Sequence, residues 1–299
     1  KWNRYFGRRL SDVTIGIIIS TIKMVKHNRR IDKVTRISES EFDRRGYLSL
    51  DKNERLTCFS DSFISNIRKK VTSELLSSYP NLHNSYEELS KHAGVSSDEI
   101  FISAGSEYSI KYIIEAFLEP GVNIVLHKPS YAMYEVYAKI AGAQVKSINF
   151  NNNFTLPIDS LFKEIDKKTR MLVVENPNGF IGKSISFQQL ESIAKECNKR
   201  NICLVVDEAY YGFCKVTAVP LIKKYKNVIV VRSFSKVYGL AGLRIGYCIS
   251  NRKMISLIEK TRPMHEITSF SAMVLEEILE RKDEVDDYIA SINHANEFT

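Results

Sequence analysis

The feature that most constrains the fold is a series of seven short apolar runs, rich in β-branched residues, which begins at Ile100. The runs cover residues 100–103, 122–126, 143–148, 171–174, 202–206, 228–231 and 244–249. Helical patterns separate many of them, at residues 106–118, 131–141, 158–167 and 186–200. Strands that alternate with helices form a parallel sheet covered on both faces. We therefore predict an α/β fold with a mostly parallel, seven-stranded sheet flanked by helices. Its functional residues should lie just beyond the carboxyl ends of the strands.

Helical patterns also flank the predicted sheet on both sides along the chain. Residues 60–76 read as one amphipathic helix with apolar Phe63, Ile64, Ile67, Val71 and Leu75, and residues 86–92 as a second helix. After the last strand, residues 254–260, 269–281 and an acidic stretch from Asp283 also have helical patterns.

Composition limits the classes of protein to which this chain can belong. At 299 residues, with 44% apolar and 26% charged residues, it resembles an ordinary globular protein. No apolar run approaches the roughly 20 residues of a membrane span. The five cysteines form no C-x-x-C pair, which favours free thiols in a reducing compartment and hence the cytoplasm. The six histidines lack metal-ligand spacing, so we predict no metal site.

Positive charge is concentrated at the N-terminus. Residues 1–45 contain 12 Lys/Arg and 5 Asp/Glu, hence +7 of the net +8. A basic arm of this kind could meet nucleic acid or an anionic partner. No aromatic stacking pattern accompanies the charge, so we favour a solvated extension or linker and expect no nucleic acid partner.

One lysine stands in an unusual place for a charge. Lys236 comes shortly after the apolar run 228–231, and the hydroxyl residues Ser233 and Ser235 stand just before it. Burial lowers the pKa of a lysine and makes the amine a usable nucleophile and base. Arg244, eight residues downstream, carries a planar guanidinium suited to a phosphate. An amine that can form a Schiff base beside a phosphate-binding group is what pyridoxal 5′-phosphate (PLP) requires.

The stretch S-F-S-K-V-Y-G-L-A-G-L-R-I-G (residues 233–246) resembles the lysine signature of fold-type I PLP-dependent aminotransferases, closest to the histidinol-phosphate aminotransferase group. The resemblance implies a class I/II transaminase that moves an amino group from a donor such as glutamate to a keto or aldehyde acceptor. It implies a Schiff base between Lys236 and PLP, a phosphate site that includes Ser233, Ser235 and Arg244, and a homodimer.

Further residues match the family beyond other strands. Backbone N–H groups at a helix N-terminus bind phosphate, and Gly105, Ser106 and Glu107 open a predicted helix. An aspartate that ends an apolar strand is costly unless paired, and Asp207 stands there. The resemblance pairs Asp207 with the pyridine nitrogen of PLP, stacks Tyr131 on the ring and directs Tyr210 to the ring oxygen O3′. It also sends Tyr79 to the phosphate of the neighbouring subunit.

Two stretches depart from the family pattern. Residues 175–182 read E-N-P-N-G-F-I-G where the family has N-P-N-N-P-T-G, so Gly179 replaces the asparagine that bonds O3′. Asn176, Asn178 or water would then have to supply the donor, and we assign Asn178 to the cofactor site. Residues 47–55 are similar to the L-D-x-N-E-N-P segment that lies over the family's active site, with Arg55 and Leu56 in place of Asn-Pro.

By this resemblance the chain divides into three parts: a basic extension or linker (1–45), a large PLP-binding domain (46–262, with an N-terminal arm and helix at 46–78), and the start of a C-terminal helical region (263–299). The small C-terminal domain, with its substrate-binding arginine, is expected to be absent or truncated. Two alternatives remain open: a PLP-dependent decarboxylase or lyase of the same fold, and a non-catalytic PLP-fold module for dimerisation or regulation. The physiological substrate does not follow from the sequence.

Overall fold

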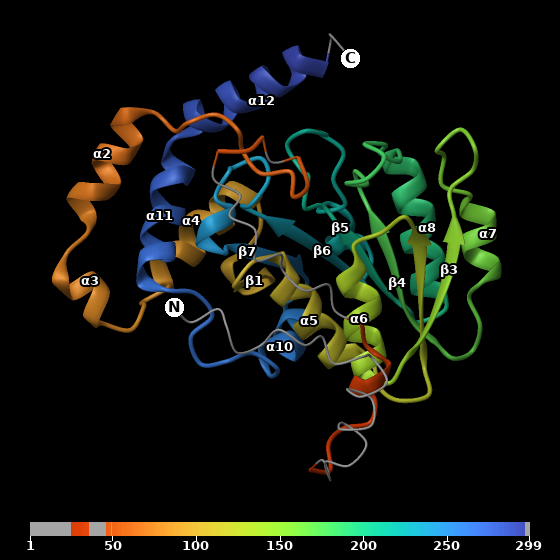
Figure 1. Ribbon diagram of the computed structural model, residues 1–299. Coiled ribbons are helices and arrows are strands. Elements are labelled where there is room, and N and C mark those ends of the chain that lie inside the picture. Colours follow the sequence, from red (N-terminus) through yellow and green to blue (C-terminus); the bar gives the residue numbers. More distant parts are fainter. Residues whose placement is uncertain (1–24, 36–45, 49, 297–299) are drawn as a thin grey trace, which may run out of the picture.

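The computed structural model describes residues 25–35, 46–48 and 50–296. Its centre is one sheet of seven strands: β1 (Ile100–Ser103), β2 (Asn123–Lys128), β3 (Gln144–Asn149), β4 (Thr169–Glu175), β5 (Cys203–Asp207), β6 (Val228–Ser233) and β7 (Gly246–Ser250). The strand order is β1-β7-β6-β5-β4-β2-β3. Strand β7 pairs antiparallel with both neighbours, and all other pairs are parallel. The predicted seven-stranded, mostly parallel sheet is confirmed (Figure 1).

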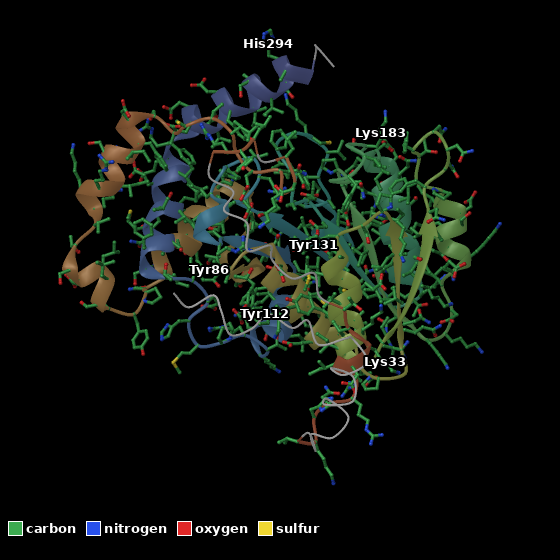
Figure 2. The ribbon with its side chains drawn as sticks, in the orientation of Figure 1. Lys33, Tyr86, Tyr112, Tyr131, Lys183 and His294 are labelled. Atoms are coloured by element: carbon green, nitrogen blue, oxygen red, sulfur yellow. The ribbon has the colours of Figure 1, made fainter. Side chains whose placement is uncertain are left out.

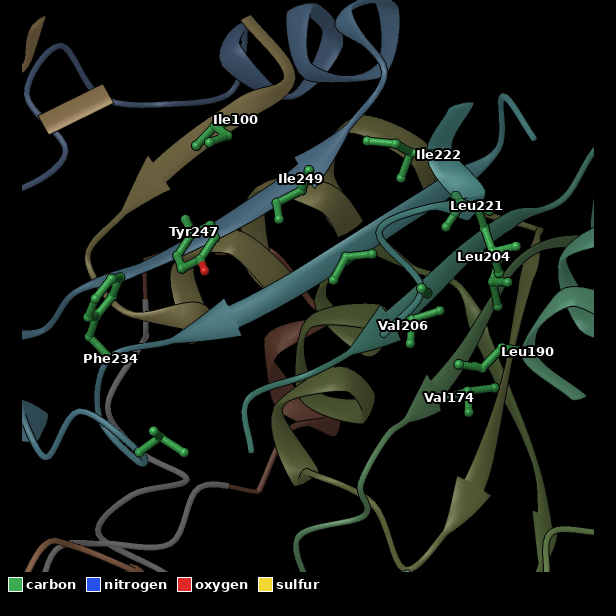
Figure 3. Packing of buried hydrophobic residues seen from close by; sticks show 14 of the residues in the cluster. Ile100, Val174, Leu190, Leu204, Val206, Leu221, Ile222, Phe234, Tyr247 and Ile249 are labelled. Atoms are coloured by element: carbon green, nitrogen blue, oxygen red, sulfur yellow. The ribbon is translucent and has the colours of Figure 1, made fainter. Parts of the chain in front are cut away.

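Alternating side chains along the central strands bury both faces of the sheet. In β5, Leu204 and Val206 face one core, whereas Val205 faces the other. This is the period of two expected of a strand, and it explains why these runs are continuously apolar. Figure 3 shows the first core, where Leu204 and Val206 pack with Val174 and Leu190.

Helices cover each face of the sheet. One core includes side chains of α5 (Ser106–Phe117), α6 (Ala132–Ala141) and α10 (Arg252–Glu259). The other includes side chains of α4 (His83–Ala93), α7 (Ile158–Lys163), α8 (Phe187–Lys199), α9 (Leu221–Lys224) and α11 (Ser269–Glu280). Short 3₁₀ turns occur at η1 (Ile31–Lys33), η2 (Ser97–Glu99) and η3 (Ala241–Leu243). The chain's described part ends with α12 (Lys282–Asn296), which lies across the top of Figure 1.

The prediction of a single helix over residues 60–76 is wrong. The structure has two helices, α2 (Asp61–Lys70) and α3 (Ser73–Ser77), separated by Val71 and Thr72 in extended conformation. Thr72 accepts a hydrogen bond from Leu75 N at 3.1 Å and so caps α3. A hydroxyl that can cap a new helix competes with continuation of the old one. Helix α7 is also shorter than the predicted 158–167.

Part of the basic extension predicted for residues 1–45 lies outside the described residues. Within 25–35, Arg30 donates to Ala141 O at 2.9 Å, next to the C-terminus of α6. His27 and Asp32 contact each other at 2.6 Å. Among the described residues, none of the helices is both long and apolar enough to cross a membrane.

Candidate active site

Most of the predicted site residues gather at one edge of the sheet. Glu175 and Asp207, which end β4 and β5, are paired in register, and Ser233 ends β6. Gly246 pairs with both Ser103 at the end of β1 and Ser233 at the end of β6, so these two strands end at the same edge. The sequence prediction that functional residues follow the strands therefore agrees with the topology.

Arg244 and the N-terminus of α5 form a cradle for an anion. A Cβ atom on Gly105 would stand 2.6 Å from Arg244 Nη2, so the guanidinium packs directly against the turn that opens the helix. The N–H groups of Ser106 and Glu107, in the first turn, have no helical carbonyl to bond. A Cβ on Gly246 would stand 2.1 Å from Ser106 N, so only glycine allows this approach. Exposed helix N–H groups beside a guanidinium suit a phosphate.

Asp207 is a buried acid, 5% exposed. Its carboxylate accepts hydrogen bonds from Tyr134 Oη at 2.7 Å and from Ala209 N at 3.0 Å. Within the described part of the chain no basic side chain is paired with it, and burial raises its pKa. A buried carboxylate without a cation is a costly arrangement, which a protonated ring nitrogen would relieve. The residues present therefore fit the cofactor that the resemblance implies.

Lys236 lies on the loop after β6, and its Nζ donates to Lys52 O at 2.6 Å. Burial is the main cause that lowers its pKa; the nearby positive charge of Arg244 lowers it further, while Glu54 opposes the shift. A lowered pKa increases the fraction of neutral amine, the form that attacks an aldehyde. Ser233 and Ser235 are both buried here, and Ser235 N donates to Ser233 Oγ at 3.0 Å.

Two tyrosines flank this edge of the sheet. Lys236 Nζ lies 5.5 Å from the ring centroid of Tyr210, whose pKa is raised chiefly by burial. Tyr131 follows β2, is 39% exposed, and is labelled in Figure 2. Its hydroxyl donates to Glu107 Oε2 at 3.2 Å, so the side chain of Glu107 orients Tyr131. The role predicted for Glu107 from the sequence involved only its backbone N–H group.

Glu175 is a residue of this site that the sequence reasoning missed. Its side chain accepts from Tyr131 N at 2.5 Å and from Asn178 Nδ2 at 3.0 Å, and so connects Tyr131 to the turn that follows β4. Burial first, and the charge of Asp207 second, raise the pKa of Glu175 to about 8. One sequence signal could have revealed Glu175: like Asp207, it is an acidic residue at the end of an apolar strand, and the two strands are neighbours.

Two of the predicted cofactor residues are not placed to contact a cofactor within this chain. Asn178 is buried, and its amide also donates to Pro129 O at 3.0 Å, so contact with a cofactor would require it to exchange partners. Tyr79 is 82% exposed and stacks on His265 at 4.4 Å. It lines a cleft of about 340 Å³ beside α3, α4 and α11, and none of the other predicted cofactor residues lines this cleft. In the part of the chain that the structure describes, no group of His, Cys, Asp and Glu side chains could hold a metal ion.

The fold is an α/β fold with Lys236, Asp207 and Arg244 at one edge of its sheet, and comparison with known proteins gives the family. Residues 47–297 match the model of aminotransferase class I and II, so the chain belongs to that family. It is 34% identical over 233 residues to the histidinol-phosphate aminotransferase of Thermoanaerobacter pseudethanolicus, covering 77% of this chain and 66% of that protein. The chain thus spans slightly less than two thirds of the length of this relative.

Solved structures share the fold. The histidinol-phosphate aminotransferase of Sinorhizobium meliloti, in complex with pyridoxal-5′-phosphate, superposes with a TM-score of 0.75 at 22% identity, over 81% of this chain and 67% of that one. The L-threonine-O-3-phosphate decarboxylase of Porphyromonas gingivalis gives 0.64 at 21% identity, over 77% and 71%. The fold-type I architecture expected from the sequence is confirmed.

Proposed function

We propose that this protein binds PLP and catalyses the transfer of an amino group from a donor, with glutamate as the first candidate, to a keto or aldehyde acceptor. The observation that carries the proposal is the arrangement at one sheet edge. A desolvated Lys236 and a buried Asp207, which has no cationic partner among the residues that the structure describes, lie at the same edge as an anion cradle built from Arg244 and the N-terminus of α5. Family membership supports it.

Each residue then has a defined task. The Arg244 guanidinium and the N–H groups of Ser106 and Glu107 would bind the phosphate, with Ser233 and Ser235 nearby. Asp207 would hold a proton on the ring nitrogen, Tyr131 would pack on the ring face, and Tyr210 would donate to O3′. When bound, PLP supplies an electron sink for the carbanion that proton removal creates. The Lys236 amine would hold the aldehyde of the cofactor, and as a free base it would carry the proton to and from the substrate carbon.

The predicted homodimer and cytoplasmic location belong to this proposal. Tyr79 would contact the phosphate of a second copy, which fits its exposure and its place in a cleft that none of the other predicted cofactor residues lines. All five cysteines are free thiols, which suits a reducing compartment.

The test is PLP binding by the purified protein and by Lys236→Ala. The unaltered protein should develop a visible absorption band and, after borohydride reduction, carry the cofactor on the peptide that contains residue 236. Lys236→Ala should lose both signals, whereas Lys253→Ala, which removes an exposed lysine of α10, should keep them. Equal covalent labelling of Lys236→Ala and the unaltered protein would refute the assignment.

A second candidate reaction is decarboxylation, because the fold is shared with the L-threonine-O-3-phosphate decarboxylase. The residues around Lys236 serve both reactions, since both pass through negative charge on the same substrate carbon. Single-turnover experiments separate them: release of 2-oxoglutarate from glutamate supports transamination, and release of CO₂ from an amino acid supports decarboxylation.

A further inference from the structure

The ring of Tyr210 occupies the space of the side chain that residue 179 lacks. A Cβ atom on Gly179 would stand 2.4 Å from Tyr210 Cε2 and 3.0 Å from Tyr210 Oη. An asparagine at this position and the observed tyrosine ring therefore exclude each other. As a result, the two donors that the family directs to O3′ are reduced to one, the Tyr210 hydroxyl.

The neighbouring asparagines do not replace the missing donor. Asn176 is fully buried; its Oδ1 accepts from Ile185 N at 2.8 Å, and its Nδ2 faces Val216 O at 3.5 Å. Asn178 donates to Pro129 O and Glu175 and accepts from two backbone N–H groups of the turn. Both amides are thus used to hold the turn together.

An asparagine from a distant part of the sequence contacts Tyr210 instead. Asn53 Nδ2 donates to Tyr210 Oη at 2.9 Å. Asn53 has a φ of 51°, in the left-handed region that asparagine tolerates better than most residues. The preceding residue, Lys52, accepts the Lys236 amine through its carbonyl, so this segment contacts both the tyrosine and the lysine of the site.

A phenol oxygen that accepts a hydrogen bond keeps its own proton to donate. Accepting polarises the O–H group, and hydrogen bonds in a chain strengthen one another. A bond from Asn53 to Tyr210 therefore makes the tyrosine a better donor to a third group.

We propose that Asn53 is a positioning residue of the active site, which orients the Tyr210 hydroxyl and strengthens the hydrogen bond that this hydroxyl donates to the O3′ atom of PLP. It thereby compensates for Gly179. The inference rests on the function proposed above, because O3′ belongs to the cofactor.

Several ionisable groups face Tyr210. Burial is the main cause that raises its pKa; the bond from Asn53 opposes the shift, and the charges of Asp207 and Glu175 add to it. Lys236 faces the ring at 5.5 Å. Removing the Asn53 amide should therefore raise the pKa of Tyr210 with these other groups unchanged.

The first test uses the protein without cofactor. A fluorinated tyrosine at position 210, whose phenol is more acidic than that of tyrosine, is followed by fluorine NMR. Asn53→Ala should raise its pKa, and Asn53→Asp, which exchanges the donor for an acceptor, should raise it further. Asn66→Ala, which removes an amide bonded to Glu277 on α11, is the control and should leave it unchanged. An unchanged pKa in Asn53→Ala, or an equal shift in Asn66→Ala, overturns the proposal.

The second test uses the PLP-loaded protein. The pH midpoint of the cofactor's visible absorption should move in Asn53→Ala in the same direction as in Tyr210→Phe, and by less. An unmoved midpoint overturns the inference about O3′. If the unaltered protein binds no PLP while the first test still gives its shift, the proposed function fails and the Asn53–Tyr210 contact stands, so the two failures are distinguishable.

Discussion

Arg55 Nη2 and Glu284 Oε2 lie 3.7 Å apart, and their side chains are only 7% and 5% exposed. The guanidinium also packs on the rings of Phe59 and Tyr288, 4.3 and 4.7 Å from their centroids. Arg55 is two residues from Asn53. The ion pair between Arg55 and Glu284 therefore connects residues 52–55, which contact the candidate site, to α12. The residue that departs from the family's Asn-Pro thus has a structural partner within this chain.

Arg55→Ala should destabilise the protein by about 1–3 kcal/mol, because it removes two ring contacts and leaves Glu284 without its closest buried cation. The measurement is urea unfolding followed by circular dichroism. Arg252→Ala is the control, because its ion pair with Asp98 lies on the surface, with side chains 82% and 49% exposed. That variant should change stability by less than about 1 kcal/mol. Equal effects of the two variants would contradict the structural role of Arg55.

Asp207→Asn should weaken PLP binding by about ten- to hundredfold, because it removes the charged group proposed above to pair with the ring nitrogen. The same change should stabilise the cofactor-free protein at neutral pH, since burial raises the pKa of Asp207 and ionising it in the folded state is costly. Fluorescence titration with PLP and thermal unfolding of the cofactor-free protein measure the two effects. A variant that loses both affinity and stability would show that Asp207 has only a structural role.

Glu175→Gln should change how the stability of the cofactor-free protein depends on pH. The pKa of Glu175 is raised to about 8, so the folded protein holds a proton that the unfolded chain has already lost. Stability due to this group is therefore greatest below the unfolded pKa and falls as pH rises toward about 8, by up to about 1.4 kcal/mol per pH unit. Urea midpoints across this pH window should fall less steeply in Glu175→Gln. Parallel slopes would contradict a raised pKa.

The sheet could be predicted from sequence because each central strand is buried on both faces and bounded by polar residues. Lys236, Asp207 and Arg244 were predicted as a set from the resemblance to the fold-type I aminotransferases. The structure brings them to one edge of the sheet, because the parallel strands β5 and β6 end there and the antiparallel strand β7 begins there. The break between α2 and α3 was not predicted, because the apolar spacing continues through Val71 while the hydroxyl of Thr72 caps a new helix. The contact of Asn53 with Tyr210 was not predicted either, because it joins residues 157 positions apart and depends on how the segment around Asn53 packs against the sheet edge.

Gly179→Asn, which restores the residue typical of the family, should destabilise this protein by about 1–3 kcal/mol, because the new Cβ would stand 2.4 Å from the Tyr210 ring. In Tyr210→Ala the ring is absent, so the same substitution should cost less there, and a double-mutant cycle measured by urea unfolding gives the coupling. Gly242→Asn is the matched control, since a Cβ on Gly242 meets nothing within 4 Å. If Gly179→Asn and Gly242→Asn have equal effects in both backgrounds, the two side chains do not compete for this space. A coupling free energy between residues 179 and 210, with none between residues 242 and 210, would mean that an asparagine at position 179 is tolerated only when the side chain at position 210 changes as well.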